Sequence, residues 1–307
     1  MKNYFRFNLT GRKLFPIWML YLLLFLAPYM ALVFKMQNIQ ADNSSSLLFF
    51  PLILLLIIIA YAIMYYIAKL AIEHVALNEK SVVFKGTFGG YFGTVLLGFF
   101  LSIITLGVYL AWFIRNIHSF FVDNSSYDSS AFKFRGKGGK LFVILLLSFF
   151  VPVVILSVAL YLIGDFAQAS SLMVVQQVVM MIILIPYMYL VYKWLIDIDY
   201  KGFHISWKTN FWNSCGKIAI EVILTMITLG IYWPMAVVKL YKYFAERTTA
   251  QSDVRQLQFG YDIDPMSDFL FIWGQILLSI ITLGIYYPWA FSKIGSRILG
   301  KTYLEER

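Results

Sequence analysis

Glu221 is the one carboxylate within a long apolar segment of this sequence, and it precedes Thr228 by seven residues. A carboxylate inside a membrane segment is costly and commonly belongs to a proton or cation pathway. Lys217 lies one helical turn earlier, so an ion pair near the membrane surface is the more conservative interpretation. Glu221 therefore predicts either a polar path through a membrane or a local ion pair.

Other polar side chains in apolar surroundings extend this candidate path. Gln176 and Gln177 lie in a second apolar segment, where hydrogen bonding between helices explains them more simply than a path does. The remaining members occupy positions in or near a repeated motif. The complete candidate path comprises Glu221, Gln275, Thr105, Thr228, Thr282, Gln176 and Gln177.

Residues suited to metal binding or catalysis form no recognisable pattern. The three histidines, His74, His118 and His204, are scattered, and the sequence contains no H-E-x-x-H string. Cys215 is the single cysteine, which excludes an internal disulfide and a multi-thiolate metal site. We therefore predict no metal, no cofactor, no catalytic residue and no enzymatic activity.

A six-residue pattern, Ile-Thr-Leu-Gly-(Val/Ile)-Tyr, occurs three times, at 104–109, 227–232 and 281–286. Glycine weakens a helix, proline removes a backbone donor, and Tyr and Trp favour the level of lipid headgroups. Each copy therefore predicts a helix that breaks at the motif. The segments concerned are Phe92–Ile114, Ile218–Val238 and Phe269–Phe291. The motif residues are Gly107, Tyr109, Trp112, Gly230, Tyr232, Pro234, Gly284, Tyr286, Pro288 and Trp289.

The composition is that of a membrane protein. Of the 307 residues, 61% are hydrophobic and 13% are charged, whereas soluble domains carry about 25% charged residues. In water such a chain would expose large apolar patches, so we exclude a soluble enzyme and a disordered protein. Four uncharged segments are each long enough to cross a bilayer as a helix. They are Leu14–Phe34, Leu47–Ala68, Leu141–Ile163 and Leu172–Tyr192.

Longer strings also recur along the chain. A Phe-x-Phe string at 5–7 returns at 132–134, and a Gly-x-Lys-Leu-Phe string at 11–15 returns at 138–142. Two long apolar segments and one motif copy follow each occurrence. We therefore predict one membrane domain made of two repeat units and a third, partial copy, with the boundaries 1–123, 124–250 and 251–307.

The distribution of charge favours four membrane crossings over seven. If the motif segments also crossed, the 25 Lys and Arg side chains would divide between the two sides, against the positive-inside rule. If each motif segment instead enters and leaves on one side, every basic residue except Lys35 lies on that side. We therefore predict re-entrant or interfacial motif segments and a cytoplasmic N-terminus, with seven straight helices as the alternative.

The net charge of +9 is best explained by the same orientation. Basic loops on the cytoplasmic side lie near anionic lipid headgroups, which we predict as partners together with the bilayer itself. Nucleic acid is not predicted as a partner. The sequence leaves the oligomeric state open.

Short runs with alternating apolar residues precede each hydrophobic block. The alternation is typical of short strands, although interfacial loops with aromatic anchors explain it equally well. The overall prediction is an all-α polytopic membrane protein with an internal duplication, in which strands on the cytoplasmic side are a minor addition. The runs are at Phe5/Phe7, Val83, Phe132/Phe134, Phe203/Ile205/Trp207 and Leu257/Phe259.

The three motif copies and the Phe-x-Phe strings make nearly the whole chain similar to the YjgN-like family of bacterial inner-membrane proteins, whose function is unknown. The first copy departs from the pattern, because Leu110-Ala111 stands where the others have Trp233-Pro234 and Tyr287-Pro288. The resemblance implies a location and an architecture, but no reaction and no site residues.

Two functions remain open at this point. Many transporters build their sites near the bilayer midplane from duplicated units with broken helices. The same features here favour a transporter or channel for a small solute, ion or lipid. The shortage of polar residues in the apolar segments favours instead a non-transporting envelope scaffold or lipid-organising protein.

Overall fold

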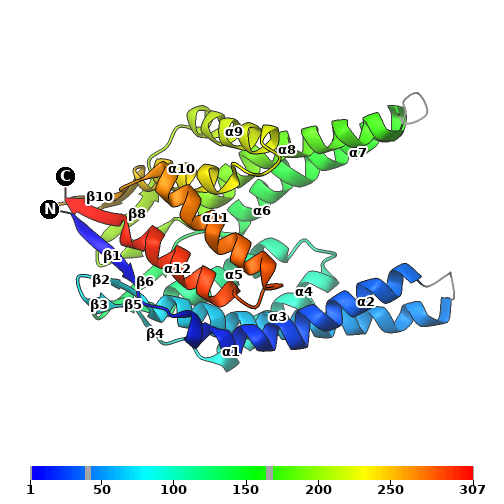
Figure 1. Cartoon of the computed structure of the whole chain (residues 1–307), viewed down its shortest axis with the longest axis horizontal. Helices are drawn as coiled ribbons and strands as arrows, with labels where there is room; N and C mark the ends of the chain where they lie inside the picture. Colours follow the sequence, from blue (N-terminus) through cyan, green and yellow to red (C-terminus); the bar gives the residue numbers. More distant parts are fainter. Residues whose placement is uncertain (1, 39–42, 164–168, 307) are drawn as a thin grey trace.

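The computed structural model describes residues 2–38, 43–163 and 169–306. Two long helical hairpins extend to the right in Figure 1, away from a group of short strands at which both ends of the chain lie. Three pairs of shorter helices lie beside the strand-side portions of the long helices.

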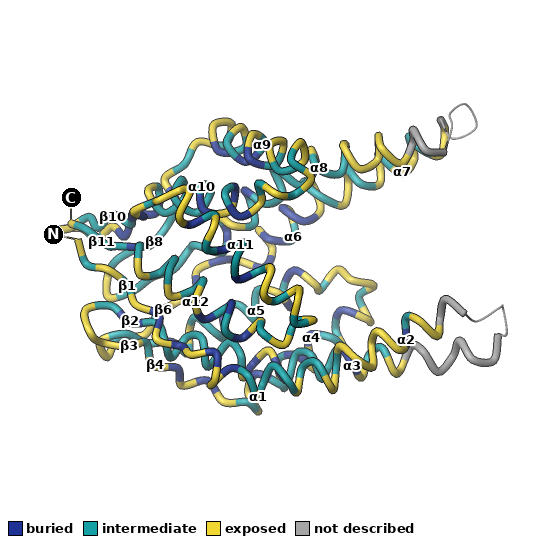
Figure 2. The backbone as a smooth tube through the Cα atoms, viewed as in Figure 1, coloured by how far each residue is buried: buried dark blue, intermediate teal, exposed yellow. Residues whose placement is uncertain are grey.

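Four helices within the described residues are long and apolar enough to cross a membrane, as predicted from their length and composition. Most of their side chains are exposed or half-buried, which Figure 2 shows along both long hairpins. The first helix comprises α1 (Gly11–Tyr21), η1 (Leu22–Leu26) and α2 (Ala27–Asn38), and the second is α3 (Asn43–Glu73). The third comprises α6 (Gly138–Leu145), η2 (Leu146–Phe150) and α7 (Val151–Ile163), and the fourth is α8 (Ala169–Leu195).

Both η segments are single π-helical turns, and a proline lies just beyond each of them. Pro28 follows η1 and Pro152 follows η2. Proline supplies no N–H for the usual hydrogen bond to the residue four positions earlier. We attribute the local widening of the helix to this missing donor.

The repeated motif breaks the helix in all three copies. The resulting pairs are α4 (Phe88–Ile104) with α5 (Leu110–Asp123), α9 (Phe211–Ile227) with α10 (Trp233–Ala245), and α11 (Pro265–Ile281) with α12 (Tyr287–Gly300). We refer to these pairs as hairpins 1, 2 and 3. The predicted division of the chain at residues 123 and 250 remains a prediction.

The expectation of an all-α fold was wrong. The described residues contain an 11-stranded antiparallel sheet that curves into a nearly closed barrel. Its order is β3-β2-β1-β11-β10-β9-β8-β7-β6-β5-β4. The strands are β1 (Asn3–Phe7), β2 (Val75–Leu77), β3 (Lys80–Ser81), β4 (Val83–Phe84), β5 (Ser125–Tyr127), β6 (Ser130–Phe134), β7 (Ile198–Tyr200), β8 (Phe203–Trp207), β9 (Thr248–Gln251), β10 (Gln256–Tyr261) and β11 (Thr302–Glu306).

One short stretch of chain closes most of the gap between the two end strands. β3 and β4 are separated only by Val82, whose N–H donates to the carbonyl of Val75 at 2.9 Å. On the other side, Val83 pairs with Ser126 of β5. The stretch thus changes partner from β2 to β5, and little free sheet edge is left.

Tight turns that need left-handed backbone join three of the strand pairs. Positive φ angles occur at Asn78 and Glu79, at Asp128 and Ser129, and at Lys201 and Gly202. Two successive positive φ angles are the mark of a two-residue hairpin turn that matches the twist of the strands. Asp128 also binds the amino groups of Lys80 and Lys201, which lie on neighbouring turns.

Tryptophans on the short hairpins hold the starts of two long helices. A Cβ atom added at Gly138 would lie 2.5 Å from Cδ1 of Trp112, and one at Gly11 would lie 2.5 Å from Cγ of Trp289. Only glycine permits such an approach at these helix starts. Hairpin 1 therefore packs against α6, while hairpin 3 packs against α1.

Polar contacts link the start of the chain to the residue after β10. We call the group formed by Lys2, Tyr4 and Asp262 the latch. Asp262, just after β10, accepts hydrogen bonds from Lys2 Nζ at 2.8 Å and from the Tyr4 hydroxyl at 2.6 Å. These bonds from Lys2 and Tyr4 lower the pKa of the Asp262 carboxyl below its usual value. Since the carboxylate is the bonded form, the latch holds above the ordinary pKa of an Asp, about 3.9, and is lost as pH falls through the lower pKa of the folded protein.

Replacing Asp262 with Asn is therefore expected to speed amide hydrogen exchange in β1 at neutral pH, by about twofold to fivefold because exposed ion pairs are weak. Exchange measured by mass spectrometry on Asn3–Phe7 tests this. The native protein and the variant should converge in strong acid, where the native latch is protonated. A difference that persisted unchanged at low pH would contradict the assignment.

Candidate functional site

The break in each short hairpin is built by its threonine. Thr105 Oγ1 donates to the carbonyl of Leu101 at 2.7 Å and accepts from the N–H of Tyr109 at 2.9 Å. The side chain therefore closes the end of α4 and the start of α5 together. Thr228 and Thr282 make the equivalent bonds. The three threonines of the predicted polar path thus lie in three separate turns, each used as a helix cap.

A leucine forms the extreme tip of each hairpin, in a backbone conformation that suits leucine poorly. Leu106, Leu229 and Leu283 have φ angles of 49°, 50° and 50°, and the glycine that follows each of them also has a positive φ. The three leucines are 95%, 93% and 89% exposed. Left-handed backbone costs an ordinary residue about 1–2 kcal/mol. The chain accepts this cost in order to place a large apolar side chain at the tip.

Two of the turns have a backbone carbonyl that a neighbouring tryptophan satisfies. Trp18 Nε1 in α1 donates to the carbonyl of Gly284 at 2.8 Å, and Trp273 Nε1 in α11 donates to the carbonyl of Ile231 at 2.7 Å. A free carbonyl is expensive in an environment without water. These two turns are therefore equipped for apolar surroundings.

Glu221 is almost fully buried and belongs to a polar chain within hairpin 2. Its Oε1 accepts from Lys217 Nζ at 2.5 Å, and its Oε2 accepts from the Tyr232 hydroxyl at 2.9 Å. Lys239 Nζ donates to the same hydroxyl at 2.8 Å. Both carboxylate oxygens are therefore occupied, and the contact with Lys217 is the local ion pair of the conservative interpretation.

Hairpin 3 repeats this arrangement with a neutral acceptor. The Tyr286 hydroxyl donates to Gln275 Oε1 at 3.0 Å, and Lys293 Nζ donates to that hydroxyl at 2.9 Å. The structure thus places Glu221 and Gln275 in two different hairpins, each bonded within its own.

The two remaining glutamines of the predicted path lie elsewhere. Gln176 and Gln177 are exposed on α8. Neither lines either of the two large apolar cavities beside hairpins 2 and 3. The structure therefore does not bring the seven predicted residues together into one path.

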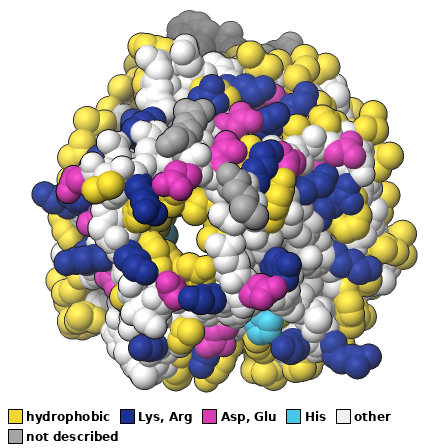
Figure 3. Space-filling view, turned by 90° about the vertical axis from the view of Figure 1, so that its left-hand side faces the viewer, with side chains coloured by type: hydrophobic (Ala, Val, Ile, Leu, Met, Phe, Trp, Pro, Cys, Tyr) yellow, Lys and Arg dark blue, Asp and Glu magenta, His cyan; other side chains and the backbone are white. Residues whose placement is uncertain are grey.

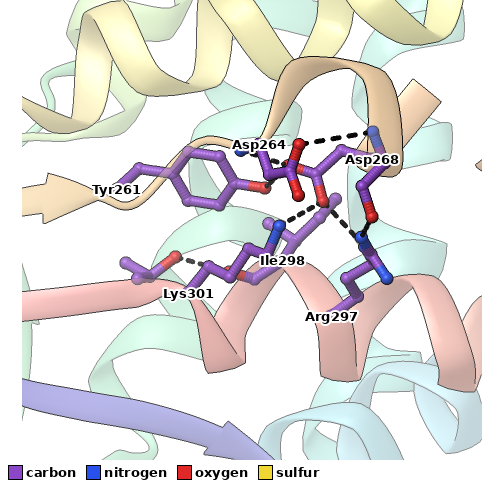
Figure 4. A network of polar contacts seen from close by, with 8 residues as sticks. Tyr261, Asp264, Asp268, Arg297, Ile298 and Lys301 are labelled. Atoms are coloured by element: carbon purple, nitrogen blue, oxygen red, sulfur yellow. Dashed lines mark hydrogen bonds and ion pairs between the residues drawn. The ribbon is translucent and has the colours of Figure 1, made fainter. Parts of the chain in front are cut away.

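Asp268, at the start of α11, is a buried carboxylate that the sequence patterns did not single out. It accepts from Arg297 Nε at 2.7 Å and from Lys301 Nζ at 2.5 Å. The Tyr261 hydroxyl and the N–H of Asp264 donate to its other oxygen, both at 3.2 Å. Figure 4 shows these groups converging on one carboxylate that is 1% exposed. The four-residue spacing of Arg297 and Lys301 was the available signal, since it places both cations on one helix face.

Two apolar cavities lie beside hairpins 2 and 3. The larger, of about 780 Å³, lies between α10, α11 and α12 and extends from Ile298 to the tip residue Leu283. The smaller, of about 580 Å³, is lined by α8, α9, α10 and five strands, with Ile205, Trp207 and Phe259 among its residues. Val237 lines both. No charged residue occurs among the described residues that line them.

The strand end of the molecule is hollowed at its centre. Figure 3 looks onto this end and shows hydrophobic side chains in the hollow, with Lys, Arg, Asp and Glu side chains around it.

Groups that could hold a metal are not gathered in the part of the chain that the structure describes, where no cluster of three or more His, Cys, Asp or Glu side chains occurs. His118 is held edge-on against Phe134, with ring centroids 4.5 Å apart. Burial lowers the pKa of His118, so its ring is neutral at pH 7. We assign it to packing.

A family model described as a bacterial protein of unknown function, DUF898, matches residues 2–261. The comparison with curated proteins and the comparison with solved structures both find no match.

Proposed function

The chain belongs to the DUF898 family of bacterial proteins of unknown function, and from that premise we propose that it is a membrane protein that moves lipid, or a similarly apolar molecule, between the bilayer and the mouth of its strand barrel. The family match does not confirm the resemblance to the YjgN-like family. The observation that carries it is the pair of apolar cavities that share Val237 as a lining residue.

The course of the two cavities supports a continuous route. The larger reaches the exposed tip at Leu283, and the smaller reaches β7, β8 and β10 on the strand side. Val237, which is 38% exposed, is the one described residue that both linings share, and we infer that the route passes it. A molecule that entered near the hairpin tips would therefore pass Val237 before it reached the strands.

The lining decides the class of cargo. Both volumes lie within the range of small-molecule sites, about 300–1,000 Å³. An ion or a polar solute would lose its hydration in such a cavity without gaining partners. An acyl chain would lose only contact with other acyl chains. We therefore favour lipid over the ion and solute alternatives, and Glu221 lies outside this route.

The short hairpins fit a re-entrant arrangement. A helix of 17 residues such as α4 is about 25 Å long at 1.5 Å per residue, less than the roughly 30 Å of a hydrocarbon core. With both ends of each hairpin at the strand side, the apolar tips would end inside the bilayer. We propose that the strand side is cytoplasmic, because the basic residues other than Lys35 belong to that side of the four crossings. The loops that this arrangement places on the opposite side, 35–46 and 164–171, lie partly outside the described residues.

A second candidate is a lipid-organising protein that transports nothing. The three exposed leucine tips favour it, since apolar wedges that end partway through a bilayer would disturb lipid packing without any cavity. The two candidates differ in whether lipid passes Val237.

Replacing Val237 with Trp tests this difference. The larger side chain is expected to fill the junction and to lower the transfer of fluorescent phospholipid from protein-containing vesicles to acceptor vesicles by about tenfold, as expected for a loss of about 1.4 kcal/mol. Val83→Trp is the matched control, because Val83 is exposed on β4 and lines neither cavity.

Transfer by Val237→Trp at the native rate would contradict the proposed route. Absence of transfer by the native protein, with lipid retained in native mass spectrometry, would instead favour the lipid-organising alternative.

A further inference from the structure

A third cavity, of about 270 Å³, lies along hairpin 1 and differs from the others in being polar. Thr94 and Gly98 of α4 contribute to its wall, while Arg115 and Asn116 of α5 contribute donor groups, and Tyr109 lies at one end. It shares no lining residue with the apolar route of the proposed function. A role for this cavity is therefore independent of lipid movement through that route.

The tyrosine of hairpin 1 lacks the acceptor that its counterparts have. In hairpins 2 and 3 the equivalent hydroxyl donates to Glu221 or to Gln275. Hairpin 1 has Gly98 at the matching position, seven residues before its threonine. The Tyr109 hydroxyl accepts a bond from Asn116 Nδ2 at 3.3 Å. Its own proton has no acceptor among the described residues.

In hairpin 1 the missing acceptor side chain is accompanied by a change in the neighbouring packing. A Cβ atom at Gly98 would lie 2.0 Å from Cδ2 of Phe113, so the phenyl ring occupies the place of a side chain. Hairpins 2 and 3 have alanine at the position of Phe113, Ala236 and Ala290. Hairpin 1 thus pairs glycine with phenylalanine, where the others pair an acceptor side chain with alanine.

Arg115 adds a positive charge to the same cavity. It forms no ion pair within the described part of the chain, and its bonds go to the carbonyl of Gly136 and to Asn116 Oδ1, both at 3.3 Å. Asp123, the one acid among the described residues that line the cavity, keeps its charge, but both of its oxygens accept bonds from elsewhere, one from the Ser119 hydroxyl and one from the N–H of Phe134. Hairpins 2 and 3 have the uncharged Val238 and Ser292 at the position of Arg115.

We propose that this cavity binds a phosphate oxyanion, either the phosphodiester of a lipid headgroup or free inorganic phosphate. The anion accepts the proton of Tyr109, the role that a side-chain oxygen has in the other hairpins. The guanidinium of Arg115 supplies the charge and the planar pair of donors that suit a phosphate. Asn116 is the third donor at the site.

Binding is tested on the purified full-length protein with two probes, phosphatidylglycerol and inorganic phosphate. Affinity is read from thermal stabilisation and from native mass spectrometry. Tyr109→Phe and Arg115→Gln are each expected to weaken binding at least tenfold, because hydrogen bonds to charged groups are the strong ones. The matched controls are Tyr286→Phe, whose hydroxyl bonds inside hairpin 3, and Arg255→Gln on the exposed β9–β10 connection.

A double variant tests the site by rebuilding the missing acceptor. Gly98→Gln with Phe113→Ala gives hairpin 1 the pair found in hairpin 3, where the acceptor Gln275 is neutral and needs no cation beside it, so the variant should fold. We expect it to abolish binding of both probes while melting near the native temperature.

The outcomes separate cleanly. Binding of phosphatidylglycerol without inorganic phosphate supports a headgroup site, and binding of inorganic phosphate supports a free oxyanion. Binding of neither probe to the native protein overturns the proposal. It is equally overturned if the double variant, Tyr109→Phe and Arg115→Gln all bind within twofold of the native protein.

Discussion

Replacing Asp268 with Ala is expected to destabilise the protein by about 3–5 kcal/mol, the cost of leaving buried charges without their partner. The carboxylate is 1% exposed, and the side chains of Arg297 and Lys301 are only 24% and 25% exposed. Without it, the two cations would repel each other in a poorly hydrated place, and the Tyr261 hydroxyl would lose its acceptor. Denaturant unfolding in a mild detergent measures the loss.

The control is Asp253→Ala, since Asp253 is exposed on the connection between β9 and β10. We expect it to change the unfolding free energy by less than about 0.5 kcal/mol, as surface substitutions commonly do. A triple variant that also converts Arg297 and Lys301 to Met should recover most of the lost stability, because no buried charge is then left without a partner. A cost below about 1 kcal/mol for Asp268→Ala would show that water reaches the cluster.

The triple variant Leu106→Asp/Leu229→Asp/Leu283→Asp places a charge at each hairpin tip. It is expected to destabilise the inserted protein if the tips lie in the bilayer, but not if they lie in water. If the tips lie inside the bilayer, each carboxylate costs about 2.5–3.5 kcal/mol at full depth, and three together prevent stable insertion. If the tips lie in water, Asp should be neutral or stabilising, because it tolerates left-handed backbone better than leucine.

Protease protection of the hairpins in reconstituted vesicles distinguishes the two cases. The control, Val254→Asp, changes a residue that is 89% exposed between β9 and β10, where a charge should be harmless. Full protection of the triple variant would exclude the re-entrant arrangement and, with it, the entrance that we propose near Leu283.

The parts of the fold that could be predicted are those determined by residues close together in the sequence. Unbroken apolar runs predicted four long helices. The pair Lys217 and Glu221 was visible because its members are one helical turn apart. Tyr232, which completes the environment of that carboxylate, lies beyond the break and required the folded hairpin to be seen.

The barrel was not predicted because some of its strands are very short and some of its strand pairs join distant parts of the sequence. β3 and β4 have two residues each, too few for an alternating pattern to be recognised. Tyr4 pairs with Tyr303 at the opposite end of the chain. Asp268 was overlooked for the same reason, since its cations lie 29 and 33 residues away on another helix.

The pairing of the first strand with the last has a consequence for how the protein is made. β11 pairs with both β1 and β10, so β1 has β2 on one side but lacks its second neighbour until Thr302–Glu306 have left the ribosome. Domains form progressively during synthesis, and all four long helices precede these residues along the chain. During that time the exposed side of β1 could pair with a strand of another nascent copy. The synthesis of β11, which follows the other described strands, therefore governs whether each chain completes its own barrel or becomes joined to a neighbour.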